Sequence, residues 1–321
     1  MRRVRYHAYG EPEVLIVEEA ERPVPGSGQV LIRAEAIGVN FVDVRFRRGG
    51  EGIFRRPLPG RPTGDVVGVV AEVGSGVDPA LVGQRVAALA EDAYAEFAVA
   101  EASWLAAIPP GLGAGDAVMV PMAGPVALRV LRQADFRPGE TVLVHSAAGG
   151  IGHLVVQLAK RLGAGLVIGA ASRGKLDFVR SAGADLAVDY GLADWPERVR
   201  EVVPGGVDVV LDAVGGQVLR QGLELLAPFG RAVIYGAASG TVDDIPAGPL
   251  FALRTVGGFN QTAWREVAPE RARAEMDEVA ELFAVGGLRT VGHVEFPLEE
   301  AAGAHKVMEE REHVGRVLLR P

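Results

Sequence analysis

The sequence predicts an α/β protein of two domains, a β-rich, partly open barrel and a doubly wound parallel sheet. Two observations lead to this prediction. Up to about residue 110, short runs of alternating apolar residues are separated by glycine and other small residues, as in a barrel of short strands. From about residue 115, strand-like and helix-like segments alternate, which is the pattern of a parallel sheet with helices on both faces.

Short strands account for most of the first region. Residues 29–40, QVLIRAEAIGVN, alternate roughly as a half-buried strand does. Residues 66–77, VVGVVAEVGSGV, repeat this pattern and include a glycine turn. Further strands are expected at 83–89 and 94–109.

The second region is expected to alternate strands with helices. The expected strands are 141–145, 166–170, 186–189, 207–212 and 231–235. The expected helices are 151–162, 174–182, 194–203 and 216–227. The C-terminal segment should add a helix at 270–285, a strand at 290–295, a helix at 298–311 and a strand at 315–319.

The composition limits the partners and the chemistry. A net charge of −8 and a pI near 5.4 argue against nucleic acid or an anionic membrane as the main partner. The sequence has no uninterrupted apolar stretch of about 18 residues, and its basic start lacks the apolar core of a signal peptide, so a cytoplasmic protein is expected. The absence of cysteine excludes disulfides, thiolate catalysis and cysteine-bound zinc. No metal site is predicted, although one built from distant histidines and carboxylates stays open.

The segment 142–163 carries the strongest functional signal. An apolar run at 141–145 is followed by the small-residue turn SAAGGIG and then by apolar residues at helical spacing. Such a unit binds the pyrophosphate of a dinucleotide, because backbone N–H groups and the positive end of the helix must approach the phosphates closely. The G-x-G-x-x-G spacing reads here as Ala147, Gly149 and Gly152. The alternative is a tight turn without a ligand.

The residues after the second of these strands favour NADPH over NADH. NAD-selective folds place an acidic residue there to accept the ribose hydroxyls. Here Ser172, Arg173 and Lys175 follow the strand at 166–170. A hydroxyl and two cations could bind a 2′-phosphate, which a carboxylate would repel. The alternative is that Arg173 and Lys175 only occupy the exposed start of a helix.

The order of these parts resembles the medium-chain dehydrogenase/reductase superfamily, and specific stretches resemble its zinc-free quinone oxidoreductase (zeta-crystallin-like) branch. Those stretches are GVNFVD at 38–43, GDVVGVVAEVGSGV at 64–77, HSAAGGIGHLVVQLAKRLGA at 145–164, GADLAVDY at 183–190, VDVVLDAVGG at 207–216, FGRAVIYGAASG at 229–240 and VGRVLL at 314–319. The resemblance implies a GroES-like catalytic domain at 1–120, completed by 259–321, and a Rossmann NADPH-binding domain at 121–258. Zinc branches carry Gly-His-Glu where this chain has Thr63-Gly64-Asp65.

The resemblance also implies roles for individual residues. Asn40 would lie near the nicotinamide and help to place the ring or the substrate carbonyl, while Asp43 and Asp65 would be structural. The remaining cofactor-binding residues would be Ala148, Gly149, Gly150 and Ile151 at the pyrophosphate, Ser172, Arg173, Lys175 and Tyr190 around the 2′-phosphate, and Val214, Gly215, Gly236, Ala237, Phe259, Asn260 and Arg316 along the rest of the cofactor.

Two positions depart from the family pattern. Relatives usually have a tyrosine two residues past Asp43, where this chain has Arg45. They also have a threonine that hydrogen-bonds near the nicotinamide, where this chain has Val126. Arg45 therefore joins Asn40 as a catalytic candidate, because either side chain could donate to the oxygen of the hydride acceptor. A backbone N–H group is the other candidate donor.

Arg45 begins a basic run in an acidic protein. The run could attract an acidic substrate, such as a carboxylated enone or a thioester of coenzyme A or of a carrier protein. The alternative is a solvated loop whose arginines pair with Glu51 or Asp43. The arginines are at positions 45, 47, 48, 55, 56 and 61.

The predicted function is hydride transfer from NADPH to a quinone or an enone without zinc. Simple alcohol oxidation would lack its usual Lewis acid. Two alternatives stay open: a biosynthetic enoyl reductase with an acidic or thioester substrate, and an NADPH-binding sensor or scaffold without turnover. A homodimer is expected, because relatives commonly pair through the edge strand at about 231–258 and an unpaired edge needs cover.

Overall fold

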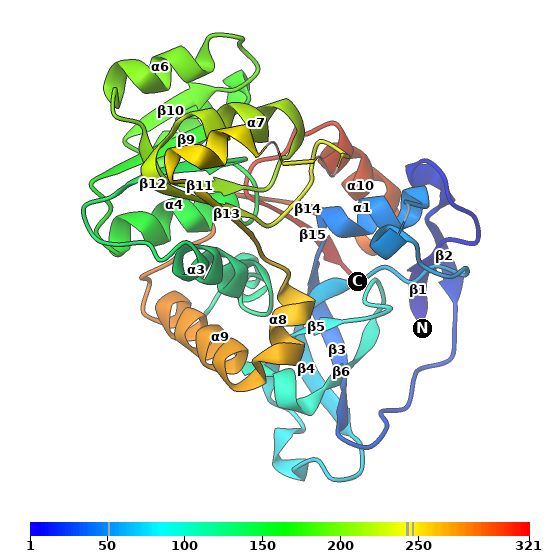
Figure 1. Cartoon of the computed structure of the whole chain (residues 1–321). Coiled ribbons are helices and arrows are strands. Elements are labelled where there is room, and N and C mark those ends of the chain that lie inside the picture. The colour runs from blue at the N-terminus through cyan, green and yellow to red at the C-terminus, as the bar shows by residue number, and fades with distance from the viewer. Residues whose placement is uncertain (51, 242–243, 246) are drawn as a thin grey trace. The chain divides into compact units, whose positions relative to one another are not determined.

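The computed structural model of the chain describes residues 1–50, 52–241, 244–245 and 247–321 (Figure 1). The chain forms two compact units. The first contains residues 1–122 and 276–321, and the second contains residues 123–275. The α/β class expected from the sequence is confirmed, since each unit has a β-sheet accompanied by helices.

The first unit is rich in strands. Its strands are β1 (Arg2–Arg5), β2 (Ile16–Glu19), β3 (Gln29–Gly38), β4 (Gly64–Val73), β5 (Arg85–Ala90), β6 (Phe97–Glu101), β7 (Ala106–Ala107), β14 (His293–Pro297) and β15 (Arg316–Arg320). Its helices are α1 (Phe41–Arg48), α2 (Ala114–Ala117) and α10 (Ala301–Glu309). Short 3-10 turns are η1 (Pro12–Val14), η2 (Gly52–Phe54), η3 (Pro79–Leu81), η4 (Ala102–Trp104) and η7 (Leu298–Glu300).

The main sheet of the first unit has the strand order β14-β15-β3-β4-β5-β7, with β6 also paired to β3. The long pair β3–β4 is antiparallel, and its register shifts twice, between Leu31 and Ile32 and between Ala34 and Ala36. Gly68 lies at the second irregularity. A Cβ atom there would be 2.0 Å from the carbonyl oxygen of Arg33, so glycine is needed for the two backbones to approach.

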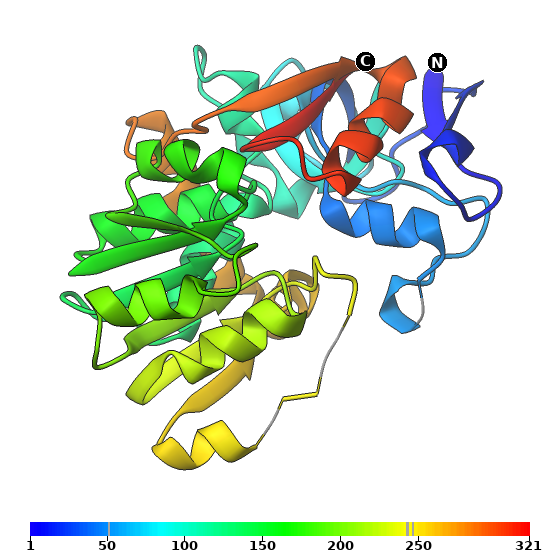
Figure 2. The same cartoon turned by 90° about the horizontal axis from the view of Figure 1, so that it is seen from above.

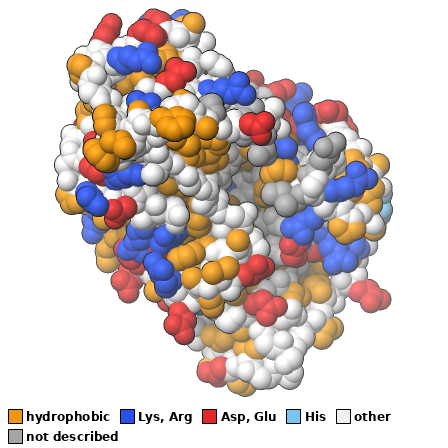
Figure 3. Space-filling view, viewed as in Figure 1, with side chains coloured by type: hydrophobic (Ala, Val, Ile, Leu, Met, Phe, Trp, Pro, Cys, Tyr) orange, Lys and Arg blue, Asp and Glu red, His pale blue; other side chains and the backbone are white. Residues whose placement is uncertain are grey.

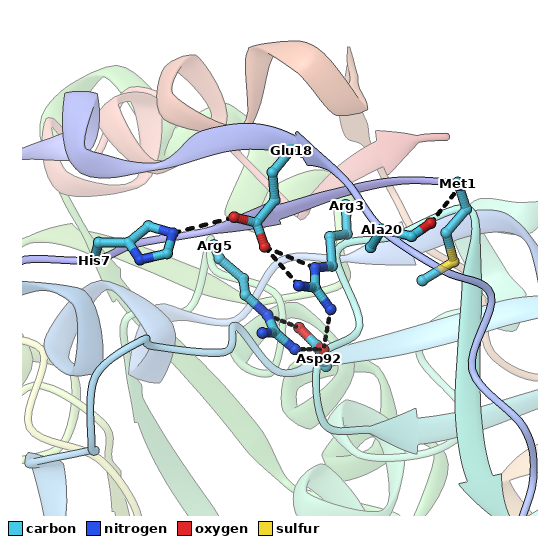
Figure 4. Close-up of polar contacts among 7 residues, drawn as sticks. All are labelled: Met1, Arg3, Arg5, His7, Glu18, Ala20 and Asp92. Carbon is cyan, nitrogen blue, oxygen red and sulfur yellow. Dashed lines mark hydrogen bonds and ion pairs between the residues drawn. The ribbon is translucent and has the colours of Figure 1, made fainter.

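The basic residues at the start of the chain lie in and just after β1, which pairs antiparallel with β2. Arg3 Nε donates to Glu18 Oε1 at 2.8 Å, and His7 Nε2 lies 3.1 Å from the other oxygen of the same carboxylate (Figure 4). Arg5 pairs with Asp92. The cations of this segment therefore face acidic side chains of the same unit.

The second unit alternates strands and helices. Its strands are β8 (Thr141–His145), β9 (Leu166–Ala171), β10 (Leu186–Asp189), β11 (Val207–Asp212), β12 (Leu226–Ile234) and β13 (Thr255–Gly258). Its helices are α3 (Ala123–Gln133), α4 (Gly152–Arg161), α5 (Leu176–Ser181), α6 (Trp195–Val202), α7 (Gly216–Glu224) and α8 (Gln261–Val267), with 3-10 turns η5 (Arg173–Lys175) and η6 (Gly248–Ala252). Helix α9 (Pro269–Ala284) begins in this unit and ends in the first.

The sheet of the second unit is parallel and has the order β10-β9-β8-β11-β12-β13. Helices cover both of its faces (Figure 2). The chain adds β9 and β10 on one side of β8 and then returns to add β11 on the other side. Ligands of such sheets bind beyond the carboxyl ends of the strands at this reversal, which lies between β8 and β11.

The observed elements match most of the expected ones. Strands β8, β10 and β11 have the expected bounds. The single strand expected at 94–109 is instead divided into β6, η4 and β7. Helix α1 was not expected, because FVDVRFRR alternates apolar and polar residues as a strand does. The segment is helical and ends at Gly49, whose φ of 77° suits a glycine cap.

Candidate functional site

The turn between β8 and α4 is shaped by close backbone contacts. Ser146 adopts a left-handed conformation with φ 54°, and its carbonyl accepts the N–H of Gly149 at 3.0 Å. A Cβ atom on Gly152 would lie 2.1 Å from that same carbonyl oxygen and 2.8 Å from the Cα of Ala147. The turn therefore depends on glycine at position 152, the third position of the expected fingerprint.

The predicted pyrophosphate residues lie in this turn. Ala148 is buried, whereas Gly149, Gly150 and Ile151 are partly exposed. No side chain caps the start of α4 in the described structure. The first N–H groups of a helix lack partners within the helix and carry partial positive charge. The turn thus fits a phosphate group, which such N–H groups bind.

A buried histidine–aspartate pair supports the same edge of the sheet. His145 ends β8 and Asp212 ends β11, and both side chains are fully buried. His145 Nδ1 lies 2.6 Å from Asp212 Oδ1, and Asp212 Oδ2 accepts the N–H of Gly215 at 2.8 Å. Asp212 therefore ties the strand end to the loop that follows it. Neither sequence spacing nor periodicity indicated this pairing.

The loops after β11 and β12 lie against each other. Ser239 N–H donates to the carbonyl of Val214 at 2.7 Å. A Cβ atom on Gly215 would be 3.1 Å from the carbonyl oxygen of Thr241, and one on Gly236 would be 2.9 Å from that of Ala213. The predicted cofactor residues Val214, Gly215, Gly236 and Ala237 are thus brought together beyond the carboxyl ends of these two strands.

The predicted 2′-phosphate residues follow β9 and β10. Arg173 is largely exposed, and its Nε lies 3.4 Å from an oxygen of Asp189, a buried residue that ends β10. Ser172 and Lys175 flank Arg173 in the chain and are partly exposed, as is Tyr190. The sequence alone did not indicate Asp189 as a partner of Arg173. The acidic residue of NAD-selective folds is expected after β9, whereas Asp189 lies at the end of β10.

Three further predicted positions belong to the second unit. Asn260 is the N-cap of α8, and its side-chain oxygen accepts the N–H of Ala263 at 3.0 Å. Phe259 is partly exposed and donates its backbone N–H to Ile234 at 2.9 Å. Val126 lies in α3 with only 4% of its surface exposed.

The other predicted site residues form a separate, buried group in the first unit. Asn40 follows β3, Asp65 lies in β4, and Arg316 begins β15. Arg316 Nη1 donates to Asn40 Oδ1 at 2.9 Å, and Asn40 Nδ2 donates to Asp65 Oδ2 at 3.2 Å. Arg316 Nη2 bonds to the same oxygen of Asp65, which closes a ring of three side chains. The resemblance indicated each residue singly but not this ring.

Asp43 lies close by in α1 and is also buried. Its carboxyl group accepts the N–H of Thr63 at 2.7 Å and the hydroxyl of Thr63 at 3.0 Å. Burial raises the pKa of Asp43 to about 7, although these hydrogen bonds act in the opposite direction. The alternative in which arginines of the basic run pair with Asp43 is therefore wrong. Glu51, the other partner named in that alternative, lies outside the described residues.

The basic run is held by acidic and aromatic partners. Arg47 is fully buried and bonds to Glu309 and to the carbonyl oxygen of Gly10, while Arg48 Nε lies 2.7 Å from Glu309. The guanidinium of Arg45 lies 4.6 Å from the ring centre of Phe54. Figure 3 shows Lys and Arg side chains gathered around α1 and η2. Part of the run is therefore structural, whereas Arg45 is partly exposed.

The described residues can also be compared with what metal binding and membrane insertion require. No group of three or more His, Cys, Asp or Glu side chains there could hold a metal ion. Within the same residues, no helix has both the length and the apolar character needed to span a bilayer.

Comparison with known proteins adds family matches on both halves of the chain. Residues 26–110 match the alcohol dehydrogenase GroES-like domain, and residues 150–281 match the zinc-binding dehydrogenase family. A 2-haloacrylate reductase from Burkholderia sp. is 35% identical, over 98% of this chain and 97% of its own length.

Solved structures are similar over the whole chain. A mycobacterial protein complexed with NADPH has a TM-score of 0.92 and 35% identity, with 100% of both chains covered. The Escherichia coli quinone oxidoreductase complexed with NADPH has a TM-score of 0.89 and 30% identity, again with 100% of both chains covered.

Proposed function

Because this chain belongs to the medium-chain dehydrogenase/reductase family, we propose that it transfers hydride from NADPH to a quinone or an α,β-unsaturated carbonyl compound. The chain is an NADPH-dependent oxidoreductase, since it matches a reductase over nearly the full length of both chains and similar structures contain NADPH. The observation that carries the proposal is the turn 146–152, whose shape requires Gly152 and whose helix start is uncapped.

The second unit would hold the cofactor, which supplies the hydride when bound. Backbone groups of 148–151 would bind the pyrophosphate at the start of α4. Ser172, Arg173, Lys175 and Tyr190 would surround the 2′-phosphate, with Asp189 orienting Arg173. The remaining contacts would come from Val214, Gly215, Gly236, Ala237, Phe259 and Asn260.

The first unit would act on the acceptor. When a quinone or enone accepts hydride at carbon, its oxygen gains negative charge. A fixed N–H donor aimed at that oxygen stabilises the developing charge, and the amide of Asn40 can supply one. The proposal uses no zinc. The chain has no cysteine, and Thr63-Gly64-Asp65 stands where zinc relatives have Gly-His-Glu, with Asp65 bonded to Arg316 and Asn40.

An acidic acceptor is the second candidate. The relative named 2-haloacrylate reductase acts on an unsaturated acid by its name. The partly exposed guanidinium of Arg45, stacked on Phe54, is a cation that could bind such a carboxylate. An NADPH-binding sensor or scaffold without turnover is the alternative from another class.

The test is NADPH consumption by the purified protein with a panel of acceptors. The panel contains 1,4-benzoquinone, a simple enone, 2-chloroacrylate and an enoyl thioester, and NADPH binding is titrated by fluorescence in parallel. Turnover of the quinone or the enone supports the main proposal. Turnover of 2-chloroacrylate alone, lost in Arg45→Tyr, favours the acidic acceptor. Tight binding without turnover of any acceptor supports the sensor, and absence of NADPH binding would contradict all three.

We also propose a homodimer through the edge strand β13. Three large apolar side chains near this edge are exposed, namely Phe229 by 71%, Phe251 by 89% and Leu253 by 61%. The backbone N–H of Phe229, in β12, donates to the carbonyl of Leu253, just before β13, at 3.0 Å, so these two apolar residues lie on adjacent segments. Covering an open edge and such a patch is favourable. Light scattering that shows only monomer at micromolar concentration would rule this out.

A further inference from the structure

The amide of Asn40 is held at both ends. The register of neighbouring strands explains how, because Gly38 pairs with Asp65 on β4 and with Leu318 on β15. Asn40, two residues after Gly38, therefore lies beside Asp65 and Arg316. All three polar side chains are buried, with exposed fractions of 4% for Asn40, 0% for Asp65 and 5% for Arg316.

The chemistry of the two partners fixes the orientation of the amide. A guanidinium can only donate hydrogen bonds, and a carboxylate can only accept them. The side-chain oxygen of Asn40 must therefore face Arg316, and its Nδ2 must face Asp65, as the contacts at 2.9 and 3.2 Å have it. A flipped amide would set two donors against each other and two acceptors against each other, in a buried place where each mismatch is costly.

One donor of this amide is left over. Nδ2 carries two hydrogens, and Asp65 accepts one of them. Asn40 makes no other side-chain hydrogen bond with the described residues. The hydrogen-bonding group of this amide that remains is thus an N–H and not a carbonyl oxygen.

The hydrogen-bonded ring of Asn40, Asp65 and Arg316, which we call the lock, also needs space beside the backbone of β3. A Cβ atom on Gly38 would lie 2.2 Å from Arg316 Nη2 and 2.9 Å from its Cζ. Any side chain at position 38 would therefore displace the guanidinium. Glycine at this place in β3 lets Arg316 reach Asn40 and Asp65 together.

We propose that Asp65 and Arg316 are positioning residues, which hold the Asn40 amide so that its free Nδ2–H faces the oxygen of the hydride acceptor. The inference rests on the proposed function and assigns Arg316 to Asn40 in place of the cofactor. A donor fixed in advance needs no reorganisation as charge develops on the acceptor oxygen.

The first test observes the amide itself and needs no turnover. The sequence contains two asparagines, Asn40 and Asn260. Protein labelled with side-chain ¹⁵N-asparagine should therefore give two NH₂ groups, and Asn260, which is exposed, serves as the internal control. We expect slow hydrogen exchange at Asn40 and at least tenfold faster exchange in Arg316→Met and Gly38→Ala. Unchanged exchange in both variants would overturn the lock.

The second test is a double-mutant cycle on turnover with the best acceptor of the panel. We expect Arg316→Met to lower kcat at least tenfold, to change the Kd for NADPH less than threefold, and to be largely rescued in Arg316→Lys, which keeps a donor. Gly38→Ala should lower kcat similarly although it removes no polar group, whereas Gly113→Ala, which meets no atom within 4 Å, should not. In the Asn40→Ala background, Arg316→Met should lower kcat less than twofold further.

The outcomes separate this inference from the proposed function. Independent, multiplicative losses in the cycle, or weaker NADPH binding with unchanged kcat, would overturn the positioning role while the reductase activity stands. A wild-type protein that reduces no acceptor would overturn the proposed function and with it the catalytic use of the lock. Thermal unfolding of each variant identifies losses of kcat that arise from misfolding.

Discussion

At the turn 146–152 of the second unit the groups that fit a ligand are backbone N–H groups, whereas around Asn40 in the first unit they belong to side chains. The turn 146–152 depends on the absence of a side chain at Gly152. The Asn40 group depends on two charged partners of fixed donor and acceptor character. Backbone sites should therefore be most sensitive to added volume, and side-chain sites to changes of charge or hydrogen-bonding type.

The largest effect is expected from Gly152→Ala, which tests the backbone half of this comparison. The new Cβ would lie 2.1 Å from the carbonyl oxygen of Ser146, so the turn must change shape. We expect NADPH binding to weaken at least 100-fold in a fluorescence titration. Gly174→Ala, near the predicted 2′-phosphate residues, meets no atom within 4 Å and is the control. Equal affinities for the two variants would show that the turn does not bind the cofactor.

Asp212→Ala should have the next largest effect, because this buried side chain holds the end of β8 and the loop after β11 through hydrogen bonds. Its removal leaves the N–H of Gly215 and the ring of His145 without their buried partner. A buried group left unsatisfied costs about 1–3 kcal/mol. We expect the free energy of unfolding to fall by about 3 kcal/mol and NADPH binding to weaken about tenfold.

Two variants refine this test of Asp212. Asp212→Asn keeps an acceptor for the N–H of Gly215, so its free energy of unfolding and its NADPH affinity should both fall less than in Asp212→Ala. Asp208→Ala removes a carboxylate of the same strand that accepts the N–H of Thr141, and it should lower stability without changing NADPH binding. A loss of NADPH affinity in Asp208→Ala as large as in Asp212→Ala would mean that the strand as a whole, and not this pair, supports the loop.

The next effect concerns the pH dependence of stability in the first unit. A buried side chain that differs by one proton between the folded and unfolded chain changes the free energy of unfolding by about 1.4 kcal/mol per pH unit. Burial raises the pKa of Asp43 to about 7 from 3.8, and burial lowers that of His305, which lies 3.0 Å from Tyr94, to about 3 from 6.5. Between pH 3.8 and 6.5 the folded chain holds a proton on Asp43 that the unfolded chain has lost. Over the same range the unfolded chain holds a proton on His305 that the folded chain lacks, so the two contributions cancel.

Single substitutions should expose each contribution. In Asp43→Asn only His305 remains, so the stability relative to the wild type should rise with pH between 3.8 and 6.5. In His305→Gln only Asp43 remains, and the relative stability should fall with pH over that range. Urea unfolding at pH 4.5, 5.5 and 6.5 measures both slopes. Parallel profiles for the wild type and the two variants would contradict the opposed pKa shifts.

Local pattern predicted the second unit better than the first. Strands β8, β10 and β11 are short apolar runs between turns, so their bounds could be read from the sequence. Helix α1 could not, because its apolar and polar residues alternate as in a strand and its end depends on Gly49. The phosphate turn was predicted for the same reason as the strands, since its glycines and flanking elements are contiguous in the chain.

The polar pairs were missed because their members are far apart in sequence. His145 and Asp212 are separated by 67 positions, and Asn40 and Arg316 by 276. Each pair forms only once the strand order and register are known. Knowing that β11 lies beside β8 places the first pair at adjacent strand ends, and knowing that β15 lies beside β3 places Arg316 next to Asn40.

Lys175→Ala is expected to have the smallest effect, and it tests whether side chains also contribute to the backbone site. Lys175 follows Arg173 in η5, and the ammonium group would pair with a 2′-phosphate that NADH lacks. We expect NADPH to bind about tenfold more weakly, a cost of about 1.4 kcal/mol, while NADH binding stays within twofold. Arg198→Ala, an exposed cation of α6 paired with Asp194, is the control and should change neither. Equal losses for both cofactors would mean that Lys175 supports the loop and does not bind the 2′-phosphate, and the selection of NADPH would then fall to Ser172, Arg173 and Tyr190.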